Sequence, residues 1–263
     1  MAIIGFWSGS KKESGQTVSI VSIATQMAIE HNYKILLIDA TFDDDTMERC
    51  FWNVNVNAKK DIAKQLNKGK MDISSGAEGL VSAVASNKTS PEIVKNYTKV
   101  VFKNRLDILL GLKTKIMEEH EKSLMLYKDL LNAANKYYDI VFVDVSKTLQ
   151  RDTTRAILEA SNIIMYAMPQ NMKLIEEYMS AARSQNILQK GNLMPLLTNS
   201  DEASKYNVNN VTKYIGEKKK ICYIPNNFAF MEAASEAGVA NFFLKTRLSS
   251  SNSQPADVRK GKR

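Results

Sequence analysis

The chain has 263 residues, 44% of them hydrophobic, and carries a net charge of +8. This length suffices for one large core and is compatible with one α/β domain or with two. No apolar run approaches the roughly 18 residues of a membrane span, and the N-terminus lacks the basic and long apolar segments of a signal peptide. The two cysteines and the two histidines lie far apart in sequence, which excludes the usual metal-ligand spacings. We therefore expect a reduced, cytoplasmic protein.

The positive charge is scattered, apart from one cluster, "RKGKR" at residues 259–263. A basic surface favours contact with nucleic acid, anionic lipid or an acidic partner. The alternative is that the lysines only keep the protein in solution. The sequence leaves both interpretations open.

Short continuous apolar runs alternate with longer helical patterns. Six of the runs predict buried strands, at residues 2–7, 34–39, 106–111, 139–145, 162–168 and 220–225. Their unbroken apolar character is typical of parallel strands that are covered on both faces. Residues 192–199 are a weaker seventh candidate, because Pro195 fits poorly in a central strand.

Helical patterns lie between these strands. They cover residues 16–31, 119–136, 171–187 and 228–237, and Gly238 follows the last as a helix stop. Alternation of strands and helices predicts an α/β fold with a doubly wound, mostly parallel β-sheet flanked by helices.

Two further segments complete the expected organisation. Within residues 68–104, "GKMDISSGAEG" indicates a loop, and "SPEIVKNYTKVVF" (90–102) indicates a helix. The polar stretch from about Ser249 is expected to be disordered. We therefore expect a single domain over residues 1–248 and a polar, basic tail over residues 249–263.

The stretch "WSGSKKESGQTVS" (7–19) joins the first predicted strand to a helix that should begin near Gln16. In a doubly wound sheet, ligands bind at the carboxyl ends of the strands. A helix N-terminus there offers unpaired N–H groups and a positive dipole end, both suited to phosphate. Thr17 lies where the Ser or Thr of a phosphate-binding loop holds Mg²⁺. Polar strand-to-helix loops are common, so this signal alone is weak.

Two carboxylates strengthen the case for a phosphate-binding site. Asp39 and Asp144 each lie at the end of a strong predicted strand. A carboxylate at that place can hold Mg²⁺ directly or through water. It can equally cap the next helix or turn, but two such residues together with the loop favour a nucleotide site.

Four segments follow one another along the chain: the loop, "LLIDA" (36–40), "YDIVFVD" (138–144) and "ASNIIMYAMPQN" (160–171). In this order they resemble the MinD/ParA family of deviant Walker A ATPases, which have the P-loop NTPase fold. The likeness covers most of residues 1–240. Where the family has K-G-G-x-G-K-[ST], this chain has "KKESGQT" (11–17).

The resemblance implies a role for each matching residue. It places Lys11 on the signature lysine that reaches across an ATP-sandwiched dimer, Asp39 near the attacking water, and Asp144 on the Walker B carboxylate. Catalytic roles are thus implied for Asp39 and Lys11, with ATP or ADP and Mg²⁺ as cofactors. The implied metal ligands are Thr17, Asp39 and Asp144. The implied nucleotide contacts are Lys11, Ser14, Gly15, Gln16, Thr17 and Val18 at the phosphates and Asn199, Pro225 and Asn226 at the base.

The chain departs from the family pattern in the loop and after Asp144. Lys12 and Glu13 replace two glycines, which permit φ above zero and a close approach of the backbone to phosphate. Gln16 replaces a lysine whose charge-assisted bond contributes roughly 1.5–3 kcal/mol, or about one to two decades of affinity. That lysine also stabilises the transition state, so hydrolysis should suffer more than binding. After Asp144 the chain has "VSK" instead of a small residue and prolines.

An acidic cluster, Asp43 to Asp45, follows the second strand. By resemblance it belongs to a switch and dimer region, and the alternative is a solvated acidic loop. Phe51 and Trp52 beside it either pack on the core or mark a partner surface. The apolar stretch "NFFLKTRL" (241–248) is too short to argue for membrane binding.

Two functions remain open. The first is a ParA/MinD-like, ATP-binding homodimeric switch, at most a weak ATPase, that positions or partitions DNA, conjugation machinery or a pilus. Its partners would be non-specific DNA or a protein of a secretion, pilus or partition system. Family members that position Tad-type pili similarly lack the second lysine. The second is a pseudo-ATPase scaffold or adaptor that no longer binds nucleotide. A nicotinamide-dependent enzyme fits the sequence poorly, because the loop lacks the G-x-G-x-x-G spacing and no His or Tyr constellation suits hydride transfer.

Overall fold

A computed structural model describes residues 2–9, 14–42, 44–53, 76–86, 91–145, 152–184, 192–217 and 221–252. Its centre is one eight-stranded sheet in the order β3-β4-β2-β5-β1-β6-β7-β8. The strands are β1 (Ala2–Trp7), β2 (Ile35–Ala40), β3 (Lys99–Phe102), β4 (Leu106–Leu109), β5 (Ile140–Val145), β6 (Ile163–Pro169), β7 (Leu193–Ser200) and β8 (Cys222–Pro225). Every pairing among these strands is parallel except that of β3 with β4.

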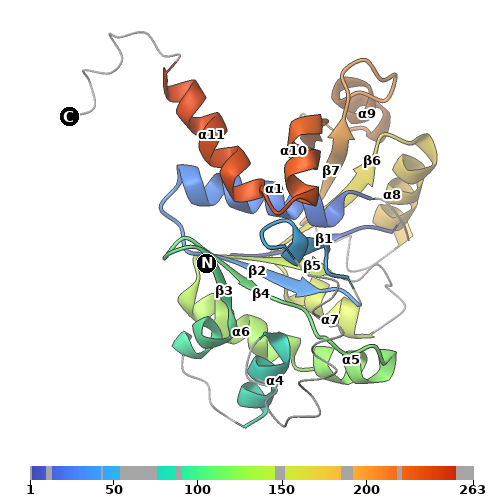
Figure 1. Ribbon diagram of the computed structural model, residues 1–263. Coiled ribbons are helices and arrows are strands. Elements are labelled where there is room, and N and C mark those ends of the chain that lie inside the picture. The colour runs from blue at the N-terminus through green and yellow to red at the C-terminus, as the bar shows by residue number, and fades with distance from the viewer. Residues whose placement is uncertain are drawn as a thin grey trace.

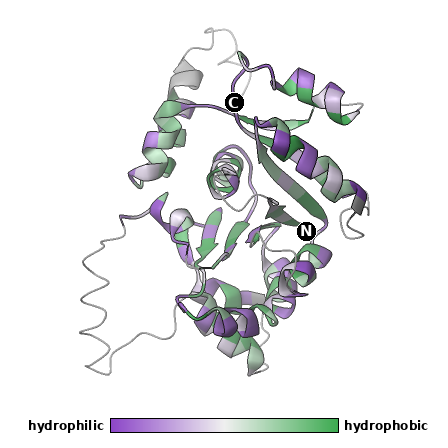
Figure 2. Ribbon diagram, turned by 90° about the vertical axis from the view of Figure 1, so that its right-hand side faces the viewer, coloured by the Kyte–Doolittle hydropathy of each residue, from purple (hydrophilic) through white to green (hydrophobic). Residues whose placement is uncertain are grey.

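Helices cover both faces of the sheet (Figure 1). One face packs against α1 (Gln16–Glu30), α2 (Thr46–Arg49), α10 (Phe228–Ser235) and α11 (Val239–Asn252). The other packs against α4 (Ala77–Ala85), α5 (Met117–Leu124), α6 (Tyr127–Tyr137), α7 (Asp152–Ala160), α8 (Met172–Ser184) and α9 (Val208–Ile215). Central strands are therefore covered on both sides, and all six residues of β2 are buried. In Figure 2 much of the sheet is green, the colour of hydrophobic residues. The predicted doubly wound α/β fold is confirmed.

The strand order places the ligand site. β1 lies between β5 on one side and β6 on the other, so the chain winds in opposite directions from β1. Such a switch in strand order leaves a crevice at the carboxyl ends of the strands. The segment that follows β1 is the loop that the sequence singled out, and α1 begins beyond it.

The structure corrects several element boundaries. The expected helix over 119–136 is two helices, α5 and α6, and the expected helix over 90–102 is wrong. That segment holds a short 3-10 helix, η1 (Pro91–Tyr97), followed by the antiparallel edge strand β3. β3 is only four residues long and half of them are exposed, so it lacks the continuous apolar signal of the other strands. The expected loop in "GKMDISSGAEG" gives way to α4 from Ala77 onward, and α7 and α9 were not predicted.

Pro195 is tolerated within β7 for a reason that the register shows. β8 pairs with β7 only from Leu196 onward, and among the described residues no strand pairs with Pro195 on that side, so the missing N–H of the proline breaks no hydrogen bond of the sheet there. The weak seventh strand is therefore a true member of the sheet.

At the C-terminal end, α11 continues to Asn252, past the expected boundary at residue 248, and the rest of the predicted tail lies outside the described residues. In the part of the chain that is described, no helix has the length and apolar character that crossing a bilayer requires.

Candidate functional site

The end of the phosphate-loop segment is held by a glycine and a threonine. Gly15, the residue before α1, has φ 67° and ψ 13°, in the left-handed region that favours glycine. A Cβ on Gly15 would lie 3.1 Å from Cβ of Thr198, and the Thr198 hydroxyl donates a 2.7 Å hydrogen bond to the carbonyl of Ser14. The loop end is thus fixed against β7. The predicted residue Lys11, with Lys12 and Glu13, lies outside the described residues.

The described residues leave the N-terminus of α1 without a side-chain cap. Gly15 provides no side-chain acceptor, and the first turn contains no acidic residue, so no described side chain accepts from the leading N–H groups of the helix. Val18 lies half-buried in this first turn. The Ser14 hydroxyl is buried and has no hydrogen-bond partner among the described residues. An unpaired buried hydroxyl beside free helix N–H groups fits a phosphate oxygen.

Thr17 lies directly against Asp144. The Thr17 hydroxyl donates a 2.6 Å hydrogen bond to Oδ2 of Asp144, whose side chain is buried at the end of β5. Because the hydroxyl proton is directed at the carboxylate, its lone pairs remain available to a cation. In the register of β2 and β5, Asp39 lies directly opposite Asp144. The structure therefore brings together the three predicted metal ligands.

Two carboxylates and a hydroxyl suit Mg²⁺ better than a metal that requires a full protein cage. Mg²⁺ keeps several waters and commonly binds through one or two carboxylates plus substrate phosphates. Among the described residues there is no group of three or more His, Cys, Asp and Glu side chains that could hold a metal on its own. The donor set therefore fits a cation that arrives with a phosphate ligand.

Gln16 is turned into the protein. Its side chain is 3% exposed, and its Nε2 donates to the carbonyls of Phe6 (2.9 Å) and Val145 (3.0 Å) and to Oδ1 of Asp144 (2.5 Å). The opposite amide orientation would place an oxygen against these three acceptors, so the network fixes the assignment. Its Oε1 is buried without a hydrogen-bond partner among the described residues.

Asp39 is a buried carboxylate with a raised pKa. Burial, and then the charge of Asp144, raise the pKa of Asp39 to about 7, while hydrogen bonds from Thr41 oppose the shift. Its Oδ1 accepts from the Thr41 N–H (2.9 Å) and hydroxyl (2.6 Å). Gly111, beyond β4, borders the same carboxylate: a Cβ there would lie 2.9 Å from Oδ2 of Asp39. A group that titrates near neutrality beside a second carboxylate is characteristic of functional sites.

The predicted base contacts lie at the ends of β7 and β8. Asn199 is exposed and has φ 52°, an uncommon conformation for a residue other than glycine. Pro225 pairs with Ser200, and the Asn226 N–H donates to the Ser200 carbonyl at 2.9 Å. Thr198 of the same strand donates a hydrogen bond to the Ser14 carbonyl, so these exposed residues lie near the end of the phosphate-loop segment.

The acidic cluster after β2 serves local structure. Asp44 accepts hydrogen bonds from the backbone N–H (2.8 Å) and hydroxyl (2.5 Å) of Thr46, at the start of α2. Asp45 forms an ion pair with Arg49 at 2.6 Å, while Asp43 lies outside the described residues. Phe51 is buried in the core, and the adjacent Trp52 is half-buried.

Several supporting residues were not predicted. Thr198 and Gly111 contact site residues that are distant in sequence, so no local pattern could have identified them. The Tyr166 hydroxyl accepts from the Gly9 N–H at 3.2 Å and so holds the start of the loop. His120 of α5 contacts the Thr41 carbonyl at 2.9 Å. Thr41 was the one detectable case, because a threonine two residues after a strand-end aspartate is a common turn partner.

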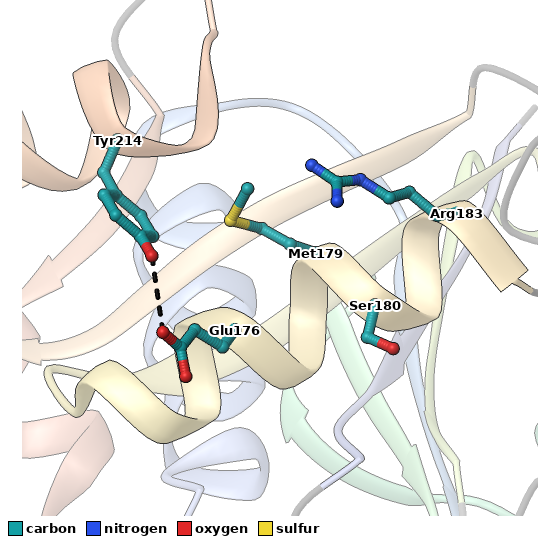
Figure 3. A pocket seen from close by; sticks show the side chains of 5 residues that line it. All are labelled: Glu176, Met179, Ser180, Arg183 and Tyr214. Carbon is teal, nitrogen blue, oxygen red and sulfur yellow. Dashed lines mark hydrogen bonds between the residues drawn. The ribbon is translucent and has the colours of Figure 1, made fainter.

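A separate hollow of about 410 Å³ lies between α8 and α9 (Figure 3). Its lining residues are Glu176, Met179, Ser180, Arg183 and Tyr214. The Tyr214 hydroxyl approaches Glu176 at 3.4 Å. None of the predicted site residues lines this hollow.

Known proteins share this architecture. A ParA family ATPase from Chlorobium tepidum TLS superposes with a TM-score of 0.72 at 16% identity, covering 95% of each chain. The septum site-determining protein MinD from Pyrococcus horikoshii OT3, in complex with Mg-ADP, gives 0.63 at 14% identity over 93% of each chain. A plasmid partition protein from Borrelia burgdorferi B31, bound to AMPPNP, gives 0.56 at 16% identity over 94% of this chain and 98% of that one.

Sequence comparison alone finds no counterpart: no protein-family model and no curated protein matches the chain. At these identities the structural likenesses establish a shared fold, that of ParA and MinD ATPases.

Proposed function

We propose that this chain is a ParA/MinD-like nucleotide-binding protein that takes ATP or ADP with Mg²⁺ and turns it over slowly, if at all. The observation that carries the proposal is the bond between Thr17 and Asp144 at the open N-terminus of α1, with Asp39 opposite. The solved relatives with Mg-ADP and AMPPNP support the choice of ligand.

In this proposal each part of the site has one task. The N–H groups of α1 and the Ser14 hydroxyl bind phosphate oxygens, the Thr17 hydroxyl and the two carboxylates hold Mg²⁺, and Asn199, Pro225 and Asn226 border the base. Bound Mg²⁺ would neutralise phosphate charge. Slow turnover follows from Gln16, because a neutral amide cannot supply the cationic stabilisation that a lysine gives a phosphoryl-transfer transition state.

Calorimetric titration with Mg²⁺-ATP and Mg²⁺-ADP tests the proposal. Thr17→Val, which removes the hydroxyl at nearly constant volume, should weaken binding at least tenfold. Thr25→Val is the matched control, since Thr25 lies buried on the same helix and its hydroxyl has no hydrogen-bond partner in the described part of the chain. Absence of heat at millimolar nucleotide with folded protein would reject the proposal.

The larger role that we propose is a homodimeric switch that positions or partitions cargo such as DNA, a conjugation complex or a pilus. Sedimentation with and without nucleotide tests the dimer, and Lys11→Ala should reduce nucleotide-dependent association. The net charge of +8 favours DNA as one partner. Binding to random-sequence duplex should then weaken steeply between about 50 and 200 mM salt.

A pseudo-ATPase scaffold is the second candidate, and the inward Gln16 favours it. Titration without heat, together with capture of a partner that is indifferent to nucleotide, would support this function instead.

A further inference from the structure

The Gln16 amide links α1 to β1, the preceding element, and to β5, which is distant in sequence. Its acceptors are carbonyls near the ends of β1 and β5, at Phe6 and Val145, and the carboxylate of Asp144. β1 and β5 are neighbours in the sheet, with Phe6 opposite Asp144. The side chain thus ties the start of α1 to the ends of these two strands. Figure 1 shows α1 lying across the sheet.

This arrangement leaves Gln16 no donor for a phosphate. An amide nitrogen carries two hydrogens, and three acceptors already surround it. Its oxygen is an acceptor, which cannot bind a phosphate oxygen. The sequence-based expectation of a direct nucleotide contact through this side chain therefore does not suit the geometry, and a different role follows.

We propose that Gln16 is a positioning residue for Asp144. Gln16 holds Oδ1 of the carboxylate while Thr17 holds Oδ2, so the two bonds fix the carboxylate plane at the edge of the site. Glutamine thereby replaces the donor function of the family's lysine and omits its charge. Where the proposed function holds, Gln16 acts on nucleotide only through Asp144 and its Mg²⁺, and not through the phosphates.

The first test is a double-mutant cycle in urea unfolding of the nucleotide-free protein, with Gln16→Met, Asp144→Ala and the double variant. A charge-assisted bond predicts that the two substitutions are coupled by about ten- to a hundredfold in the unfolding equilibrium constant. Additive effects would overturn the proposal. This result does not depend on nucleotide, so it separates failure of this inference from failure of the proposed function. Gln26→Met, on the exposed face of the same helix, is the matched control.

Should Gln16→Met fail to fold, two variants of similar length replace it. Gln16→Lys supplies N–H donors to the same acceptors and should fold, whereas Gln16→Glu places an acceptor among acceptors and should not. If both folded equally well, the positioning role would be rejected.

The second test compares nucleotide affinity with Mg²⁺ and with excess chelator. Loss of positioning predicts that Gln16→Met lowers the Mg²⁺-dependent gain in ADP affinity about tenfold and leaves the metal-free affinity unchanged. Gln16→Lys should restore the gain. A purely structural role would lower stability without changing this ratio, and a direct phosphate contact would lower both affinities alike; either result overturns the proposal.

Discussion

Gly15→Ala probes whether the loop end is as tightly constrained as the structure indicates. The first cost is conformational, because an L-residue in the left-handed region loses roughly 1–2 kcal/mol. The second is steric: the new Cβ would lie 3.1 Å from Cβ and 3.2 Å from Oγ1 of Thr198. Thr198 cannot withdraw without breaking its bond to Ser14, and forced repacking of this kind costs about 1–3 kcal/mol. The variant should therefore lose about 2–5 kcal/mol in the free energy of unfolding.

Gly216→Ala provides the control for the conformational cost. Gly216 follows α9 with φ 78° and ψ 20°, close to the values at Gly15, but no atom of the described residues lies within 4 Å of its Cβ position. This variant should lose only about 1–2 kcal/mol. Urea unfolding followed by far-UV circular dichroism measures both losses, and calorimetry should show weaker Mg²⁺-ADP binding for Gly15→Ala alone. Equal destabilisation by the two substitutions would refute the argument that Thr198 clamps the loop.

Three further predictions concern the charged part of the site. Asp39→Asn should stabilise the nucleotide-free protein by about 2–4 kcal/mol at pH 8 and by little at pH 4. The pKa of Asp39 is about 7 in the folded protein and 3.8 ordinarily, so the wild type loses stability as the pH rises between these values. Urea unfolding of both proteins across this pH range measures the difference. Asp39→Ala should abolish any residual ATP turnover while changing ATP affinity less, measured by phosphate release and calorimetry on the same preparation. Gln16→Lys should leave ATP affinity close to that of the wild type, because the new side chain donates to the same inward acceptors; a rise of about one to two decades in titration would show instead that the side chain at this position reaches the phosphates.

The fold followed from the sequence because its signals are local. Continuous apolar runs such as "ILLIDA" predict buried parallel strands, and β2 is buried along its whole length. The elements that the sequence did not predict are those whose formation depends on packing or pairing with neighbouring elements. β3 pairs through four residues at an edge, and α7 and α9 are short helices whose stability comes from packing on the sheet.

The site was predictable in position and less so in detail. Thr17, Asp39 and Asp144 each follow from their place at a strand end or helix start, because parallel strands bring their carboxyl ends to one edge. The inward direction of Gln16 depends on carbonyls at Phe6 and Val145, which no spacing rule connects to it. Contacts such as Gly111 with Asp39 likewise arise only from the order of the strands.

At the candidate site, the hydrogen-bond geometry and the positive charge of a lysine can be considered separately. The hydrogen bonds from Thr198 to Ser14 and from Thr17 to Asp144 fit the phosphate and Mg²⁺ site that we propose, and in that proposal Gln16 supplies the donors of a lysine without its charge. A preserved geometry matters for holding a ligand, whereas the missing charge matters most when negative charge develops on a transferring phosphoryl group. A protein that used nucleotide only to change its state of association would need the geometry of the site and could lose the charge of the lysine. That difference is why binding, and not turnover, is the measurement that separates a switch from a scaffold.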